Sequence, residues 1–343
     1  MNKWRHWSRD EPNPKSLTID LHPDLTEFEQ DELFDTGIKL NNRDNLQLYS
    51  AYKYKTVRRH FQWMKDYYLD GVFLQQFGTS LKPNSNLRKF RDQVQDNVKQ
   101  AAEETGRLFA IMYDISGTKT KEDLDIIIDH WKHSVDTNII SSHSYLTDDN
   151  LPVLGIWVTC LIRAYYSKTY TVRLKKHDQG FGTENDKIMD PSLTIEFLDF
   201  FKQDGKYKAR LFGGVKRDWR SSSSGSNWAQ VYEKYDIISP WTVGSYKYEV
   251  EIENYRKILK EDVELCHSRR QKFFPVIFPG FSWGNLQYTN GNYNNIFNSF
   301  PRRGGAFLWE QVFNFLSEDI DGVYGAMFDE VDEGTGKGRK FLS

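Results

Sequence analysis

The sequence predicts an α/β fold of the (β/α)8 TIM-barrel class, extending as a single domain over residues 1–343. Three observations lead to this prediction. Segments with apolar residues at helical spacing alternate with short apolar runs, which is typical of parallel α/β folds. These runs are continuously apolar, as in strands that are buried on both faces. No glycine-rich phosphate-binding turn or Walker loop opens a helix, so a doubly wound nucleotide-binding sheet is disfavoured.

Seven strands of the predicted barrel begin near residues 71, 108, 153, 209, 235, 273 and 322. Between them, apolar residues recur every three or four positions, which is the spacing of a helix with one buried face. The second helix ends at Gly106, a residue type that favours helix C-termini. The predicted helices lie around 51–68, 86–104, 124–131, 193–201, 227–233, 255–266 and 307–315.

A closed barrel of this class needs eight strands, so the count is one short. Residues 1–50 contain few apolar residues, and we interpret them as a long loop. The pattern favours a first strand that lies before Met1. The alternative is that the weak run TIDL at 18–21 is that strand. Residues 160–190 and 282–300 are expected to be further long loops of the kind that often carry function.

The composition argues against polyanions and membranes as partners. Lys and Arg number 46 and Asp and Glu number 48, giving a net charge of −2, so no field of one sign attracts nucleic acid. No run approaches the roughly 18 apolar residues of a membrane span, and the N-terminus lacks the apolar core of a signal peptide. The two cysteines, Cys160 and Cys266, are expected to be small buried hydrophobes. We expect a monomer.

Aromatic and polar residues gather where the predicted strands end. Barrel enzymes carry their active sites at the carboxyl ends of the strands. Aromatic rings stack on the apolar face of a pyranose, while carboxylates accept hydrogen bonds from its hydroxyls. We therefore predict a carbohydrate substrate. The substrate-binding residues predicted at these ends are Tyr113, Asp114, Trp157, Trp241, Trp283 and Arg302, and Tyr288 and Tyr293 are candidates for a lid.

Four carboxylates follow the last apolar run, at Asp329, Glu330, Asp332 and Glu333. A solvated acidic loop is one interpretation, and a divalent-metal site is another, although no calcium-binding loop pattern is matched. The third interpretation is a carboxylate pair for glycosidic cleavage, in which one carboxyl protonates the leaving oxygen and the other assists at the sugar. Residues three apart point oppositely along a strand, so the pair shares one pocket only if the chain bends, as Gly334 permits.

We accordingly predict that Glu330 and Glu333 are catalytic and that Asp329 and Asp332 contact the substrate. No metal and no other cofactor is expected. The close spacing of like charges would also separate the titrations of the two glutamates, which suits one acid and one base.

Taken together, these motifs resemble those of glycoside hydrolase family 71/99-like proteins, whose best-characterised members are the family 99 endo-α-mannosidases. The last barrel strand of that family ends in E-x-x-E-G-T, which residues 330–335 match as EVDEGT. The segments DGVFLQQF, RLFAIMYDISG, ISPWTVG and FPGFSWGNL follow the family order, so the resemblance covers most of the chain. It implies a retaining, endo-acting glycosidase without a catalytic metal. By this resemblance Glu330 deprotonates the sugar 2-hydroxyl, and Glu333 is the general acid and then the general base.

The chain departs from the family in two respects. The mannosidases carry Trp-His between the two glutamates, whereas this chain has Val331 and Asp332, so mannan specificity does not follow. Family sequences also begin with a strand upstream and continue past the motif, so an incomplete chain is expected. The resemblance implies secreted or periplasmic relatives, but the sequence does not fix the compartment. A non-catalytic glycan-binding protein, an inactive fragment and a metal-dependent hydrolase remain as alternatives.

Overall fold

The computed structural model describes residues 7–8, 12–13, 16–19, 22–39, 44–118, 120–157, 191–222, 228–285, 297–336 and 341–342. The chain divides into two compact units. Unit 1 comprises residues 1–63, 242–261 and 275–343, and unit 2 comprises residues 64–241 and 262–274. The expected single domain over residues 1–343 stays a prediction.

Unit 2 contains a parallel sheet with the strand order β4-β5-β7-β8-β9-β10. Its strands are β4 (Gly71–Phe77), β5 (Leu108–Asp114), β7 (Leu151–Trp157), β8 (Arg210–Lys216), β9 (Ile237–Trp241) and β10 (Lys272–Phe273). A short strand, β6 (Thr147–Asp148), pairs antiparallel with β7. The strands follow one another across the sheet in chain order, as expected for repeated strand–helix units.

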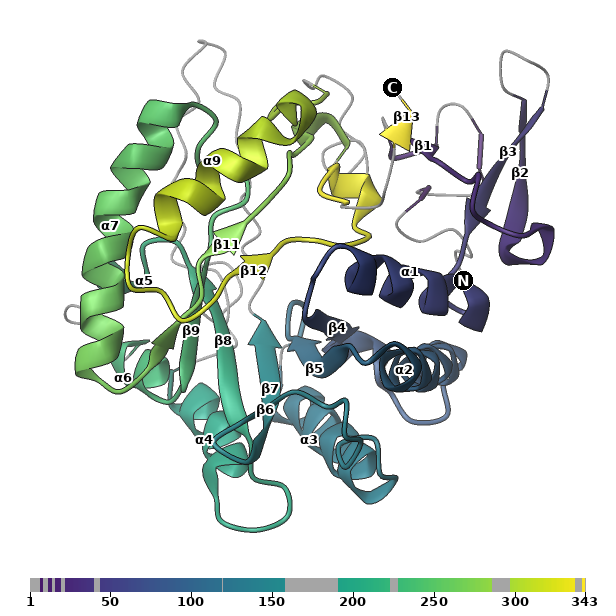
Figure 1. The fold of residues 1–343 in the computed structure, drawn as a ribbon. Helices are drawn as coiled ribbons and strands as arrows, with labels where there is room; N and C mark the ends of the chain where they lie inside the picture. The colour runs from purple at the N-terminus through teal and green to yellow at the C-terminus, as the bar shows by residue number, and fades with distance from the viewer. Residues whose placement is uncertain are drawn as a thin grey trace. The chain divides into compact units, whose positions relative to one another are not determined.

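Helices cover one face of this sheet (Figure 1). They are α2 (Asn86–Thr105), α3 (Lys121–Asp136), α4 (Pro191–Lys202), α5 (Trp219–Ser222) and α6 (Trp228–Glu233), with the 3-10 turn η2 (Gly78–Ser80). The Ser85 side chain caps the start of α2, and Gly106, with φ 68°, ends it in the left-handed conformation that favours glycine. Thr120 and Asp123 form a capping box at the start of α3.

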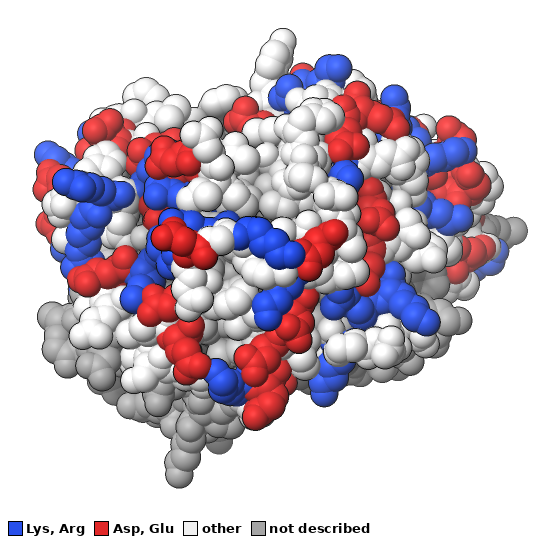
Figure 2. Space-filling model, turned by 90° about the horizontal axis from the view of Figure 1, so that it is seen from below, with Lys and Arg blue, Asp and Glu red and all other residues white. Residues whose placement is uncertain are grey.

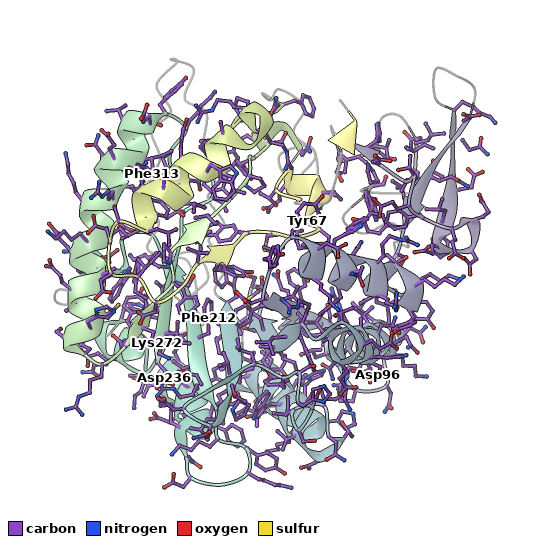
Figure 3. The ribbon with its side chains drawn as sticks, in the orientation of Figure 1. Tyr67, Asp96, Phe212, Asp236, Lys272 and Phe313 are labelled. Atoms are coloured by element: carbon purple, nitrogen blue, oxygen red, sulfur yellow. The ribbon has the colours of Figure 1, made fainter. Side chains whose placement is uncertain are left out.

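The opposite face of the sheet carries its own aromatic layer. The ring of Phe212 lies 4.5 Å from that of Phe73 and 5.9 Å from that of Phe274 (Figure 3). On the helical side, Trp131 of α3 packs edge-on against Phe201 of α4. Both faces of the strands are therefore buried, which is why their sequences are continuously apolar.

The amino ends of the strands carry a network of ion pairs. Arg210 lies 3.0 Å from both Asp236 and Asp148, Lys202 lies 2.7 Å from Asp236, and Lys272 pairs with Asp148 (Figure 3). This end of a parallel sheet in α/β barrels serves stability, since their active sites lie at the other end.

Unit 1 contains the last two parallel strands, β11 (Val276–Ile277) and β12 (Tyr324–Gly325), which pair with each other. Its helical elements are α7 (Glu249–Ser268), which begins here and ends in unit 2, α9 (Ala306–Phe315), and the 3-10 turns η3 (Arg303–Gly305) and η4 (Val331–Glu333). The rings of Tyr246, Tyr255 and Phe315 pack together, with Tyr255 on α7 and Phe315 on α9.

Each predicted strand start of the two units lies within two residues of an observed one.

The N-terminal part of unit 1 differs from the prediction. Residues 1–50 were expected to form a long loop, but β2 (Leu33–Lys39) and β3 (Asn45–Tyr49) form an antiparallel hairpin, and β1 (His22–Pro23) pairs with β13 (Phe341–Leu342). The 3-10 turn η1 (Gln30–Glu32) and helix α1 (Tyr54–Asp66) flank the hairpin. The loop prediction was wrong because the hairpin buries only alternate residues, such as Leu46 and Leu48, so few apolar positions are needed.

The run TIDL at 18–21 was the alternative candidate for the eighth strand. Within the weak run 18–21, Thr18 and Ile19 form no strand, and Asp20 and Leu21 lie outside the described residues. A first strand before Met1 therefore stays a prediction.

The surface shows no large field of one charge sign on the face seen in Figure 2, where acidic and basic side chains are interspersed. Over the described ranges, none of the helices has the length and apolar character needed to cross a bilayer. Cys266 is buried as expected, whereas Cys160 lies outside the described residues.

Candidate functional site

In unit 2, Asp114 ends β5 on the face of the sheet opposite the helices. It aligns with Trp157 of β7, which aligns in turn with Gly214 of β8, and residues aligned across parallel strands share one face. The Asp114 carboxylate is fully buried and accepts hydrogen bonds from the Gln75 side chain at 2.7 Å and from the Ser116 backbone at 2.8 Å. These two donors hold the carboxylate in one orientation at the carboxyl end of the strand.

Tyr113 points the other way, because it precedes Asp114 in the same strand. Its side chain is fully buried, and its hydroxyl lies 2.6 Å from Nδ1 of His130 on α3. Burial raises the pKa of Tyr113. Burial lowers the pKa of His130 despite the nearby Asp92 carboxylate, so a neutral Tyr–His pair lies between the sheet and its helices. This position gives Tyr113 a packing role under α3.

Trp157 and Trp241 form an aromatic pair at the same edge as Asp114. Their ring centroids are 5.3 Å apart at 81°, an edge-to-face arrangement. Gly214 makes the pair possible, since a Cβ atom there would lie 2.1 Å from the Trp157 ring. Trp157 is only 2% exposed, so Trp241, which is half-buried, offers the larger accessible ring.

Lys216 is a further residue of this edge that the sequence interpretation missed. It lies two positions after Gly214 in β8, therefore on the same face, and it aligns with Trp241. Its side chain is 5% exposed, which is rare for a lysine. The alternation of 212, 214 and 216 along the strand was the signal that could have identified it.

In unit 1, Glu330 and Glu333 lie on one short turn. The chain leaves β12 and forms η4, with Glu330 as the residue before the turn and Glu333 as its last residue. Glu330 itself has non-helical backbone angles, φ −80° and ψ 79°, and the chain bends between it and Glu333. Gly334 then ends the turn with φ 69°. The two side chains are half-buried.

The segment after β11 lies directly against this turn. The Ser282 backbone N–H donates to the carbonyl oxygen of Glu333 at 2.8 Å, and a Cβ atom at Gly334 would lie 3.0 Å from that of Ser282. Gly334 is thus required both by its positive φ and by this close approach. The next residue, Trp283, packs edge-on to Phe281 at 5.0 Å and is half-buried.

Arg302 also reaches the turn. Its guanidinium donates to the carbonyl oxygen of Gly334 at 2.8 Å, while its stem packs over Gly280, where a Cβ atom would lie 2.9 Å from Cγ of Arg302. Arg302 therefore holds the backbone one residue after Glu333.

The remaining acidic residues of the run differ in exposure. Asp329 is exposed, and Asp332 is buried at 8% exposure. Burial raises the pKa of Tyr49, and the charge of Asp329 raises it further. In the described part of the chain, no group of three or more His, Cys, Asp or Glu side chains is placed to hold a metal ion.

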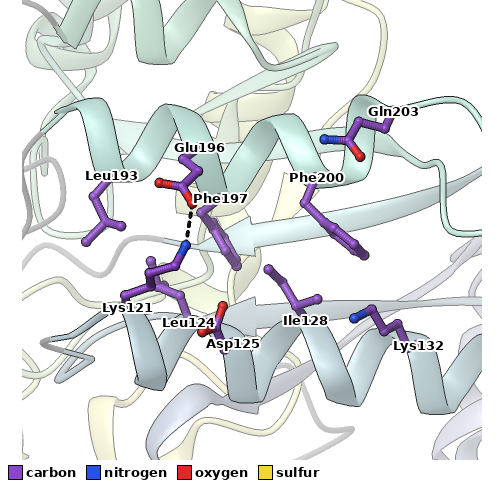
Figure 4. Close-up of a pocket in the computed structure, with 10 residues that line it drawn as sticks. All are labelled: Lys121, Leu124, Asp125, Ile128, Lys132, Leu193, Glu196, Phe197, Phe200 and Gln203. Atoms are coloured by element: carbon purple, nitrogen blue, oxygen red, sulfur yellow. Dashed lines mark hydrogen bonds and ion pairs between the residues drawn. The ribbon is translucent and has the colours of Figure 1, made fainter.

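A surface groove of about 280 Å³ lies elsewhere, between α3 and α4 of unit 2 (Figure 4). Leu124, Ile128, Phe197 and Phe200 line it, and Lys121 and Glu196 form an ion pair across it. It lies between two covering helices and contains none of the predicted site residues, so we do not identify it with the sugar site. The predicted lid residues Tyr288 and Tyr293 lie outside the described residues.

Structural comparison assigns the fold to a class that includes glycoside hydrolases. Two structures of the glycoside hydrolase family 99 endo-α-mannosidase from Bacteroides thetaiotaomicron superpose with TM-scores of 0.61 and 0.62. The sequence identities are 12% and 11%, and the matches cover 93% and 94% of this chain and 77% and 74% of the mannosidase chains. A glycoside hydrolase-like protein gives a TM-score of 0.52 at 10% identity, covering 84% of this chain and 79% of that one.

The expected resemblance to family 99 is thus confirmed as structural similarity, and the α/β fold of alternating strands and helices fits the barrel class. At these identities the likeness concerns the fold alone. No protein-family model matches the sequence, and no curated protein matches it by sequence.

Proposed function

We propose that the protein is a glycoside hydrolase that acts on polysaccharide or glycan chains, with Glu330 and Glu333 as its catalytic carboxylates. The observation that carries the proposal is that, after the last parallel strand, the chain bends into a 3-10 turn between Glu330, the residue before the turn, and Glu333, its last residue. The structural similarity to family 99 endo-α-mannosidases supports the same assignment at the level of the fold.

In the proposed reaction, the Glu330 carboxylate accepts the proton of the sugar 2-hydroxyl, and that oxygen attacks the anomeric carbon. Glu333, in its protonated form, gives its proton to the departing glycosidic oxygen, so an anhydro-sugar forms as the glycosidic bond breaks. Water then opens the anhydro-sugar. The Glu333 carboxylate takes a proton from that water, and Glu330 returns a proton to the 2-oxygen. Two inversions give net retention, as in other retaining glycosidases.

Other side chains are proposed to bind the sugar. In unit 1 these are Trp283, through its ring, and Arg302, Asp329 and Asp332 around the turn. The assignment of Tyr113, Asp114, Trp157 and Trp241 of unit 2 to sugar binding stays a prediction. No metal takes part in the proposed reaction.

The test is hydrolysis of a panel of polysaccharides and glycans by the wild-type chain, Glu330→Gln and Glu333→Gln. Loss of general acid–base catalysis should lower the rate by about 10² to 10⁴. An aryl glycoside with an acidic leaving group should restore the first step in Glu333→Gln but not in Glu330→Gln, because such a leaving group needs no proton.

Glu264→Gln is the matched control, since Glu264 is an exposed carboxylate on α7 and should leave the rate unchanged. Undiminished hydrolysis by Glu333→Gln would refute the assignment. Glycan binding measured by calorimetry without turnover by the wild-type chain would instead favour a non-catalytic binding protein.

A further inference from the structure

Val331, one of the two residues between the glutamates, is buried in a core built by the start of the chain. Val331 is 3% exposed and clusters with Ile19, Leu46 and Leu48. Trp7, Leu17 and Ile38 pack around this cluster. Every residue of the cluster except Val331 comes from the N-terminal segment, which we define as the described residues between 7 and 49, including β2 and β3.

Helix α1 and the N-terminal segment contact the chain on either side of the turn. On the upstream side, the ring of Phe328 lies 5.2 Å from that of His60 on α1. On the downstream side, β13 pairs antiparallel with β1, with Pro23 opposite Phe341. Residues from about the first sixty positions therefore contact the chain before, between and after the two glutamates.

Two contacts from elsewhere in unit 1 hold the backbone at the end of the turn, where the Ser282 N–H donates to the carbonyl oxygen of Glu333 and the Arg302 guanidinium donates to that of Gly334. A single 3-10 turn is intrinsically weak, and its own backbone hydrogen bonds run from Val331 to Asp329 at 3.0 Å, from Gly334 to Val331 at 3.1 Å and from Thr335 to Glu330 at 3.3 Å. Catalysis depends on carboxylate positions held to within a fraction of an ångström. The buried Val331 side chain fixes the rotation of the turn about its axis, and with it the side on which Glu330 and Glu333 emerge.

We infer that the N-terminal segment is the positioning device of the glutamate turn and that Val331 is the positioning residue through which it acts. The catalytic part of this inference rests on the proposed glycosidase function. The mechanical part, that the segment orders residues 329–335, does not.

The mechanical part is tested by hydrogen exchange of the peptide that spans residues 329–335 in the full chain. Val331→Ala and Leu48→Ala should each speed exchange in this peptide by about tenfold or more, because both remove packing that opposes local opening. Val331→Ile should restore protection. Val231→Ala is the matched control, since Val231 on α6 of unit 2 is 1% exposed and makes no part of this cluster. It should leave exchange of the peptide unchanged.

The catalytic part is tested by kinetics on any glycan that the wild-type chain hydrolyses. Val331→Ala should lower kcat by about tenfold to a hundredfold, with KM changed far less, since small misplacement affects the reacting groups more than substrate binding. Val331→Ile should recover kcat, and Val231→Ala should keep the wild-type value.

The outcomes separate the two proposals. Wild-type exchange of residues 329–335 in Val331→Ala overturns the inference, whatever the activity. If Leu48→Ala does not fold, Val331→Ala and Val331→Ile decide alone. Absence of hydrolysis by the wild-type chain refutes the proposed function, while faster exchange in Val331→Ala would still support the segment as the device that orders the turn.

Discussion

His60 should make the protein sensitive to mild acid. Its ring lies 5.2 Å from those of Tyr49 and Phe328, 5.4 Å from that of Trp63 and 6.4 Å from that of Phe28, and it is 6% exposed. These four rings carry no charge that would stabilise an imidazolium. Burial, with a smaller contribution from the positive charge of Arg59, lowers the pKa of His60 from 6.5 to about 3.

The sign of the effect follows from proton uptake. Between pH 6.5 and about 3, the unfolded chain binds a proton at His60 and the folded chain does not, so stability is complete above 6.5 and falls as the pH drops towards 3. The whole interval corresponds to about 5 kcal/mol, and about 2 kcal/mol should already be lost at about pH 5.

The assay is urea denaturation of the wild-type chain and His60→Leu at pH values from about 7.5 to about 4.5, followed by fluorescence. Leucine keeps the apolar volume and cannot take up a proton. The difference in unfolding free energy between the two proteins should therefore shift in favour of the variant by about 2 kcal/mol on going to about pH 5. Other histidines, including buried His130, are present in both proteins and cancel in the difference.

His143→Leu is the control, because His143 is exposed and its replacement should leave the pH dependence as in the wild-type chain. Parallel pH profiles for the wild-type chain and His60→Leu would refute the reasoning. They would mean that the aromatic surroundings of His60 open before its proton is taken up.

Two further predictions concern unit 2. Gly214→Ala should lower the unfolding free energy by about 2 kcal/mol, because its Cβ would lie 2.1 Å from the Trp157 ring and force that ring to move; an unchanged melting temperature would show that the Trp157–Trp241 pair is loosely held. Arg210→Met should lower the unfolding free energy by about 3 kcal/mol, because it leaves Asp148 and Asp236, near the amino ends of the strands, with one lysine partner each. Burial acts to raise the pKa of Asp148, but hydrogen bonds from Lys272 and Arg210 outweigh burial and lower the pKa. The Asp148 carboxylate therefore stabilises the fold at pH values above its ordinary pKa. This stabilisation is lost as the pH falls through the lowered pKa of the folded chain. Arg210→Met should therefore lose less stability than the wild-type chain between about pH 5 and pH 3, and parallel acid denaturation curves would contradict this account.

By itself, the sequence determined the alternation of helices and buried parallel strands. The run LFAIMY at 108–113 is apolar at every position, which is typical of a strand covered on both faces. The glycine after α2 and the capping box of α3 are equally local, because they depend on the conformation of one turn. These features could be predicted since each is encoded within a few neighbouring residues.

Only the tertiary structure decided how residues far apart in sequence meet. Alternation along β5 predicts that Tyr113 and Asp114 point to opposite faces, but it does not say which face carries the helices; His130 on α3 settles that for Tyr113. The room that Gly214 leaves for Trp157 likewise depends on strand alignment. The N-terminal hairpin was missed because its few apolar residues are buried by packing against Val331, which lies nearly three hundred positions later in the sequence. Burial of an apolar side chain depends on which residues pack against it. Those residues are distant in the sequence, and only folding brings them into contact.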